Sequence, residues 1–261
     1  MNENQLPIKY DLSDFLHRPI ALKVYDLVEE REIIPHRHEW GQLVYTVRGV
    51  VLASTDEGRW LVPPERVLWI PANTDHGIYS NRDVKFLVIH VAAEKCARMP
   101  STCRVLQVNP LLKELIASAE NIPRDYTPDT PESRLMEVMF DQVCIARSAP
   151  LLLPMPSDQR LRKITNIFMN NPADPRTLAA LAQDIGLSER NLARLFKRET
   201  GLTFGKWRQQ HRLMVAVELL ASGQSVTSVA LEMGYDSISA FISMFKQMMG
   251  VTPSKYFINE N

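Results

Sequence analysis

The sequence contains LAALAQDIGLSERNLARLFKRETG at residues 178–201 and a second copy of the same pattern, VTSVALEMGYDSISAFISMFKQMMG, at residues 226–250. Aligning Gly186 with Gly234 brings apolar residues together before the glycine. The second copy has one extra residue after the glycine. With this residue allowed for, the two copies share a serine, a phenylalanine, a lysine and a glycine beyond the turn. Each copy predicts a short helix, a left-handed glycine turn and a serine-capped second helix. Two such copies favour paired helix-turn-helix units over a helical bundle with a solvated basic face.

The second helices of the two copies differ on their outward faces. In the first copy, helical spacing predicts that one face is buried and that the opposite face carries Arg190, Asn191, Arg194, Lys197 and Arg198. Arginine and asparagine suit guanine and adenine edges in a major groove. The outward residues of the second copy are Ile238, Ser239, Ile242 and Ser243. We therefore expect the first copy to read bases and the second to contribute phosphate and apolar contacts.

A third helix, at residues 204–220, is predicted between the copies. Leu213, Ala216, Val217 and Leu220 form its buried stripe, and its basic residues are expected to be free to meet phosphates. A rigid helix here would hold two recognition helices about one DNA turn, roughly 34 Å, apart. The predicted phosphate contacts are Ser188, Lys197, Arg198, Lys206, Arg208, Arg212, Ser237 and Lys246.

Residues 160–257 resemble the DNA-binding domain of the AraC/XylS family of bacterial regulators. The resemblance lies in residues 178–223 and in residues 226–257. The second segment carries the pattern GYxSxSxF at residues 234–241, followed by FK, by a glycine and by TP. It implies an all-α domain whose two helix-turn-helix units enter adjacent major grooves. Ser243 stands where many members carry arginine. The implied base-facing positions are Arg190, Ala193, Arg194, Ile238, Ser239, Ile242 and Ser243, to which the chemistry of Asn191 adds one more.

The first part of the chain favours strands. Short runs rich in Val, Ile, Leu and Tyr, separated by turn formers, predict strands near residues 24–28, 42–47, 50–55, 67–70 and 85–91. Such spacing indicates a small sandwich or barrel. Helices are predicted at residues 109–120 and 131–147, and a proline-rich linker at residues 149–156.

The predicted fold class is therefore α+β, with three segments. A barrel that senses an effector is expected at residues 1–105, and a helical dimerisation segment with its linker at residues 106–156. The DNA-binding domain is expected at residues 157–261. Within it the two helix-turn-helix units lie near residues 177–200 and 225–249, joined by a helix at about 204–221.

The segment PHRHEWGQLVYTVRGV, residues 35–50, carries candidate ligands. His36 and His38 share a face of a strand, as does Gln42 if the strand continues, and His76 follows IPANTD. The pattern resembles the double motif of cupin barrels, in which two His, a Glu and a third His bind a metal. Gln42 takes the place of the Glu, and Asn73 that of a usual glycine.

Three interpretations of this segment compete. The same four residues could hold a divalent metal, could hydrogen-bond a small effector in a pocket, or could form a polar patch that serves folding alone. A neutral glutamine binds metal more weakly than a carboxylate. Tyr45, Trp60 and Trp69 could line such a pocket, but we expect them in the core.

Charge and cysteine content restrict the class of protein. The chain balances 30 basic against 30 acidic residues, yet residues 157–261 carry 13 and 9, and residues 1–156 carry 17 and 21. A basic part joined to an acidic part suits a DNA-binding domain tied to another module.

The three cysteines, Cys96, Cys103 and Cys144, fit neither a disulfide framework nor a zinc site, which favours the cytoplasm. No apolar run predicts a membrane span.

We therefore expect a homodimeric regulator of transcription, with double-stranded DNA and a small effector as partners. The alternative is a metal-dependent cupin enzyme with a helical appendage. Regulation is favoured because a metal site with glutamine for glutamate is weak, and because fusion to a DNA reader suits a sensor.

Overall fold

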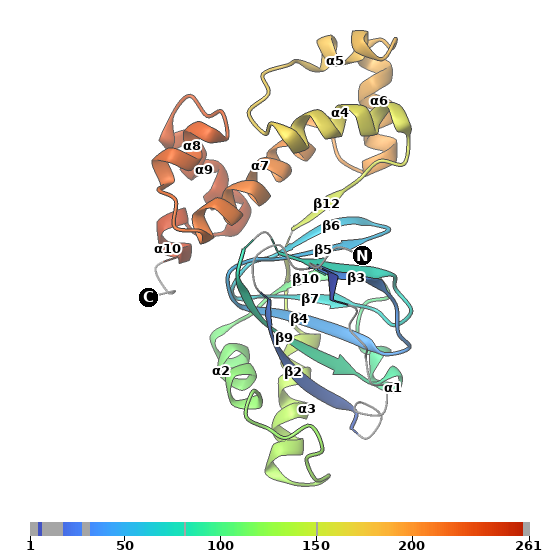
Figure 1. The fold of residues 1–261 in the computed structure, drawn as a ribbon, viewed down its shortest axis with the longest axis vertical. Helices are drawn as coiled ribbons and strands as arrows, with labels where there is room; N and C mark the ends of the chain where they lie inside the picture. The colour runs from blue at the N-terminus through green and yellow to red at the C-terminus, as the bar shows by residue number, and fades with distance from the viewer. Residues whose placement is uncertain (1–4, 7–17, 28–31, 81, 150, 258–261) are drawn as a thin grey trace. The chain divides into compact units, whose positions relative to one another are not determined.

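The computed structural model describes residues 5–6, 18–27, 32–80, 82–149 and 151–257 (Figure 1). The chain forms two compact units, which divide between Leu152 and Leu153, with Glu57–Arg59 grouped in the second. Among the described residues, no helix has the length and apolar character needed to cross a bilayer.

The N-terminal unit contains two antiparallel sheets apart from one short parallel pair, β1 with β3. One sheet has the order β1-β3-β8-β5-β6 and the other the order β11-β10-β7-β4-β9-β2. The strands are β1 (Gln5–Leu6), β2 (Ile20–Leu27), β3 (Glu32–His36), β4 (Gly41–Arg48), β5 (Val51–Thr55), β6 (Gly58–Val62), β7 (Arg66–Ile70), β8 (His76–Tyr79), β9 (Val84–Val91), β10 (Arg104–Gln107) and β11 (Ser148–Ala149), with β12 (Leu152–Pro154) at the division.

Strand β4 is buried along most of its length because both of its faces are covered. Leu43 and Tyr45 join a cluster with Trp69 and with residues of two helices, α2 (Pro110–Ala119) and α3 (Pro131–Cys144). Side chains alternate along a strand, so Gln42 points to the opposite face, toward the interior between the sheets. Tyr45, Trp60 and Trp69 are core residues, as expected.

Two helices of this unit, α2 and α3, begin with local capping signals. Asn109 accepts a hydrogen bond from the backbone of Leu112 at the start of α2, and Thr130 does the same for Ser133 at α3. A short helix, α1 (Ala93–Cys96), precedes them. Helix α3 ends three residues before the predicted boundary, because the chain turns into β11. The expected proline linker includes β12, which ends at Pro154. Proline is tolerated there because β12 is an edge strand.

The C-terminal unit is helical, and its repeat is visible in the structure (Figure 1). Gly186 and Gly234 have φ of 67° and 71° at the two turns, the left-handed conformation that the repeat predicted. Both recognition helices start at serine caps, Ser188 and Ser237. The helices are α4 (Gln159–Asn170), α5 (Leu178–Asp184), α6 (Glu189–Thr200), α7 (Phe204–Ala221), α8 (Val226–Glu232), α9 (Ile238–Met249) and α10 (Pro253–Phe257).

A pair of glycine substitutions tests the packing of the N-terminal unit. A Cβ on Gly41 would lie 2.1 Å from Trp69 Cη2 and 2.8 Å from Cys96 Sγ, so Gly41→Ala overpacks the core. We expect a loss of about 1–3 kcal/mol in the free energy of unfolding, measured by urea denaturation. Gly205→Ala, in α7 with no atom within 4 Å of the new Cβ, is the control. It should leave stability unchanged or raise it by up to about 1 kcal/mol. Equal urea midpoints for the two variants would contradict this account.

Candidate functional site

Helix α6 presents the basic surface that the sequence predicted. Leu192, Leu195 and Phe196 are buried, so the helix has one inner face. Arg194 Nη2 lies 3.5 Å from Asn191 Oδ1, a contact that joins two of the outward side chains. The outward residues Arg190, Asn191, Arg194, Lys197 and Arg198 are all exposed, while Ala193 is half-buried.

One further arginine belongs to this surface and was missed by the sequence reasoning. Arg160 of α4 lines a concavity of about 250 Å³ together with Asn191, Arg194 and Arg198. Its guanidinium is bound to the Asp158 carboxylate at 2.8 Å. The only sequence signal was its place in a basic run before the first copy, so its approach to α6 depends on tertiary packing.

Helix α9 has the same buried pattern and a different outward face. Phe241, Met244 and Phe245 are buried. Ile238 is 39% exposed, and Ile242 is half-buried rather than fully outward. Ser239, Ser243 and Lys246 are exposed.

The two capping serines are already used locally. Ser188 Oγ accepts from the backbone N–H of Asn191 at 3.3 Å, and Ser237 Oγ accepts from that of Ala240 at 3.2 Å. A hydroxyl that accepts one bond can still donate its proton. Both serines can therefore cap a helix and donate to a phosphate oxygen at the same time.

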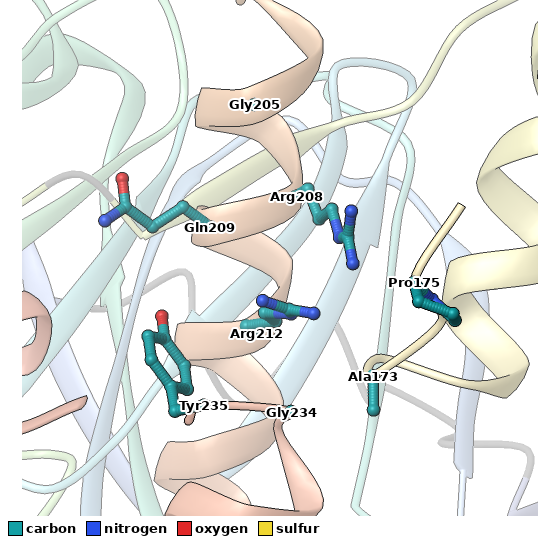
Figure 2. Close-up of a pocket in the computed structure, with 8 residues that line it drawn as sticks. All are labelled: Ala173, Pro175, Gly205, Arg208, Gln209, Arg212, Gly234 and Tyr235. Carbon is teal, nitrogen blue, oxygen red and sulfur yellow. The ribbon is translucent and has the colours of Figure 1, made fainter. Parts of the chain in front are cut away.

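The expectation that Arg208 and Arg212 are free is wrong. Arg208 donates to the carbonyl oxygens of Asp174 and Arg176, and Arg212 Nε donates to that of Pro172 at 2.9 Å. The cause is that residues 172–176 lie against α7 and offer carbonyl groups that no helix uses. Figure 2 shows both arginines extending from α7 toward this loop. Lys206 is exposed, as expected.

The histidine candidates come together from different elements. His36 ends β3 and His76 begins β8, where the two are paired across the sheet. Their ring centroids are 4.5 Å apart, and His38 lies 5.1 Å from His76. One nitrogen from each of the three rings can be chosen so that all lie within 4.8 Å of one another.

The strand does not continue from His36 to Gln42, so these residues do not share one strand face. The chain bends after His36, which places His38 in a loop, and Gln42 lies on β4 in the other sheet. Gln42 still reaches the cluster because its side chain faces the interior between the sheets. The side-chain amide lies 2.9 Å from His38 Nε2.

The bonding of the rings orients their nitrogens. The Nδ1 atoms of His36, His38 and His76 lie 2.8–2.9 Å from the carbonyl oxygens of residues 34, 40 and 74. Burial lowers the pKa of His38, and lowers that of His76 to about 4. A neutral ring that donates from Nδ1 keeps a lone pair on Nε2. Buried His76 Nε2 has no hydrogen-bond partner among the residues that the structure describes.

Gln42 complements His38 only in one amide orientation. A neutral imidazole has one N–H, and in His38 the bond to the Trp40 carbonyl uses it. Nε2 must then accept, so the Gln42 amide turns its NH₂ group toward the ring. Amide orientation is assigned from such networks. His38 is thus held by a donor that a metal or a ligand group can replace.

The sequence reasoning missed two residues beside this cluster. His90 on β9 is the cross-strand neighbour of Gln42, and its ring centroid is 6.3 Å from that of His38. Burial, reinforced by the positive charge that His38 can carry, lowers the pKa of His90 to about 3. Trp40 stacks on His38 with centroids 4.6 Å apart. A histidine inside the apolar run VKFLVIHV was the available signal for His90.

Comparison with known proteins agrees with both parts of this arrangement. Residues 28–148 match the family described as AraC-like ligand binding domain, and residues 181–258 match a helix-turn-helix domain. The HTH-type transcriptional regulator NimR of Escherichia coli K12 is 36% identical over 239 residues, which cover 91% of this chain and 86% of NimR.

Two other proteins share less with the chain. RipA of Corynebacterium glutamicum, also an HTH-type transcriptional regulator, is 35% identical over 103 residues, which are 40% of this chain and 31% of RipA. ToxT from Vibrio cholerae aligns over 92% of this chain and 98% of its own, with 12% identity and a TM-score of 0.38. With a ligand-binding domain followed by a helix-turn-helix domain, and with NimR matched over most of its length, the chain belongs to the AraC/XylS family of transcription regulators.

Proposed function

We propose that this regulator reads its promoter chiefly through α6, that α9 adds apolar and phosphate contacts, and that a ligand at the histidine cluster controls promoter occupancy. The observation that carries the first two points is the contrast between two similarly packed helices. Helix α6 exposes Arg190 and Arg194, whereas the base-facing positions of α9 carry only isoleucine and serine. Regulation follows if the ligand binds differently to DNA-competent and DNA-incompetent states.

Four residues of α6 are suited to base edges. Arg190 and Arg194 are long enough for a bidentate contact with guanine, and Asn191 offers the donor and acceptor pair that adenine requires. Ala193 is small and leaves room beside them. Phosphate contacts fit the flanks of the two helices, at Ser188, Lys197, Arg198, Lys206, Ser237 and Lys246.

Helix α9 offers a different kind of readout. The thymine C5 methyl group projects into the major groove and is read by apolar contact. Ile238, exposed at the first turn of α9, can make such a contact, and Ile242 lies one turn further on. Ser239 and Ser243 can hydrogen-bond bases without strong selectivity. We call the DNA contacted by α6 the first half-site and the DNA contacted by α9 of the same chain the second half-site. We therefore propose that the second half-site contains thymines.

Modified DNA separates the two kinds of readout. Genome-wide mapping supplies the bound site, and fluorescence anisotropy then compares thymine with deoxyuridine, which lacks the methyl group, at each half-site. Deoxyuridine in the second half-site should weaken binding by wild type and leave Ile238→Ala unaffected. Arg194→Ala should cost about 1–3 kcal/mol and relax preference at the first half-site.

Lys206→Ala is the control for this experiment, because loss of a phosphate contact weakens binding to all sequences equally and lowers the salt slope by about 1. Equal relaxation of sequence preference by Ile238→Ala and Arg194→Ala would sink the division of roles. Indifference of wild type to deoxyuridine at the second half-site would sink the methyl contact alone.

The histidine cluster is proposed to hold a divalent transition metal through His36, His38 and His76, with Gln42 as an oxygen donor. Imidazole nitrogens suit zinc, copper, nickel and iron. Bonds from the Nδ1 atoms to backbone carbonyls fix ring orientation, as is usual for metal-binding histidines. A bound ion would supply an electrophilic anchor for a donor atom of the effector. The alternative is that the same side chains hydrogen-bond the effector directly.

Metal analysis of protein purified without nickel resin tests this proposal. We expect one divalent ion per chain in wild type, loss of the ion in His76→Ala, and tighter retention against a chelator in Gln42→Glu, since a carboxylate adds charge. His90→Gln is the matched control, because His90 lies beside the three candidate ligands and outside their set. Metal-free wild type that takes up no cobalt or zinc on titration would refute the metal and leave the direct effector contact.

We propose that the regulator acts as a homodimer rather than as an enzyme, in the cytoplasm where the chromosome lies. Leu111 on α2, Val138 on α3 and Ile145 after α3 are 54%, 45% and 72% exposed. Apolar side chains on adjoining helices suit a second copy of the same surface. A two-fold dimer would place two DNA-binding domains on a repeated operator sequence.

Sedimentation velocity of the full chain tests the dimer. Wild type should sediment with twice the 29.8 kDa mass of one chain, and Val138→Lys should shift it toward monomer. Val47→Lys, at an apolar residue of β4 that is 38% exposed, is the control and should remain dimeric. A monomeric wild type in the presence of operator DNA would refute the proposal.

A further inference from the structure

Arg212 of α7 contacts the turn of the second helix-turn-helix unit and the segment that leads into the first. Its Nε donates to the carbonyl oxygen of Pro172 at 2.9 Å, in the segment that leads into α5. Its guanidinium carbon lies 5.6 Å from the ring centroid of Tyr235, in the turn between α8 and α9. Figure 2 shows Arg212 between these two segments, which are more than 60 residues apart in sequence. One side chain thus joins the segment that leads into the first helix-turn-helix unit to the turn of the second.

The segment before α5 also lies close to the turn of the second helix-turn-helix unit. A Cβ built on Gly234 would lie 3.1 Å from the Ala173 Cβ and 3.3 Å from Arg212 Nη2. The glycine therefore permits a close approach in addition to its left-handed turn. The surrounding concavity of about 360 Å³ is bounded by Ala173 and Pro175, by one face of α7 and by Gly234 and Tyr235.

Arg208 holds the same loop one turn earlier in α7. It donates to the carbonyl oxygens of Asp174 and Arg176, and its guanidinium carbon lies 5.0 Å from the Phe168 ring centroid. The Asp174 carboxylate is bound by Arg176 at 2.8 Å, so it does not compete for the α7 arginines. Arg208 thus fastens the loop to α7, and Arg212 extends that attachment to the second unit.

We infer that Arg212 is a positioning residue that fixes the angle between α6 and α9, and thereby the spacing of half-sites that the protein accepts. The inference rests on the proposed function, in which both helices engage DNA. One inserted base pair rotates a half-site by about 34–36° and shifts it along the helix axis. If the two helix-turn-helix units are held rigidly together, that change strains the complex and lowers its affinity. If their connection is loosened, the units can reorient and the affinity changes less.

A phosphate contact, which the sequence alone suggested for Arg212, predicts a different result. Loss of a phosphate contact weakens binding uniformly across sites and lowers the salt slope by about 1. Loss of a positioning contact alters the dependence of affinity on half-site spacing and leaves the salt slope unchanged. The two roles are therefore separable in one titration.

The experiment measures Kd of the full chain for operator DNA with natural spacing and with one base pair inserted or deleted, at several salt concentrations. Wild type should prefer natural spacing by about fivefold or more, the lower range of coupling between two sites. Arg212→Ala should lose most of that preference, with an unchanged circular dichroism spectrum. Arg212→Lys should not restore it, because an ammonium lacks the planar group that stacks on Tyr235.

Matched variants define the outcomes. Tyr235→Phe should keep the spacing preference and Tyr235→Ala should lose it, while Lys206→Ala should lower affinity equally at every spacing. Arg212→Ala with wild-type spacing preference and a reduced salt slope would overturn the inference and restore the phosphate role. A wild type indifferent to spacing would refute the inference together with the proposed engagement of α9, whereas sensitivity to Arg194→Ala would still support reading by α6.

Discussion

The close crossing of two helices at a small residue is the constraint on which the DNA-binding surface depends. Ala182 in α5 and Ala230 in α8 are buried, with 1% and 0% exposure. The same two residues accept the hydrogen bonds that close the turns. Leu187 N–H donates to the Ala182 carbonyl, and Tyr235 N–H donates to the Ala230 carbonyl. This hydrogen bond across a left-handed glycine ends the first helix and sets the direction of the second. The crossing therefore determines which face of α6 or α9 is buried, and so which face is left for DNA.

Because the inner faces are fixed by packing, the outer faces are free to differ. Phe196 and Phe245 occupy equivalent buried places in α6 and α9, and Leu192 corresponds to Phe241. Outward substitution costs the fold little, as surface changes usually do. The contrast between Arg194 and Ser243 can therefore arise without any change in architecture. Two units of one fold can then differ in how strongly they discriminate bases.

The parts of the structure that depend on neighbouring residues were predictable from sequence, and the parts that depend on distant pairing were not. Ser188, Gly201 and the apolar spacing between them define α6 locally, and its boundaries matched. The bend after His36 depends on pairing of β3 with β8, and the place of Gln42 depends on pairing of β4 with β9. The apolar run of β9 was visible in the sequence but its pairing with β4 was not, and β8 was not predicted at all.

The inward course of Arg208 and Arg212 has the same explanation. Their spacing of four residues on a helix correctly places them on one face. What that face meets is decided by the segment 172–176, more than 30 residues earlier in the chain. A basic residue on a DNA-binding helix is equally consistent with a phosphate contact and with a carbonyl contact. Only the position of the loop distinguishes them.

Binding of a ligand at the histidine cluster, as proposed, would also change the stability of the N-terminal domain. His76 Nε2 is buried and has no hydrogen-bond partner among the described residues, and a buried polar atom left unsatisfied costs about 1–3 kcal/mol. A ligand that accepts the Nε2 lone pair removes the cost only in the folded state. Its binding therefore stabilises the N-terminal domain by mass action. If the ligand binds there as proposed, sensing would rest on an incomplete core that the ligand completes.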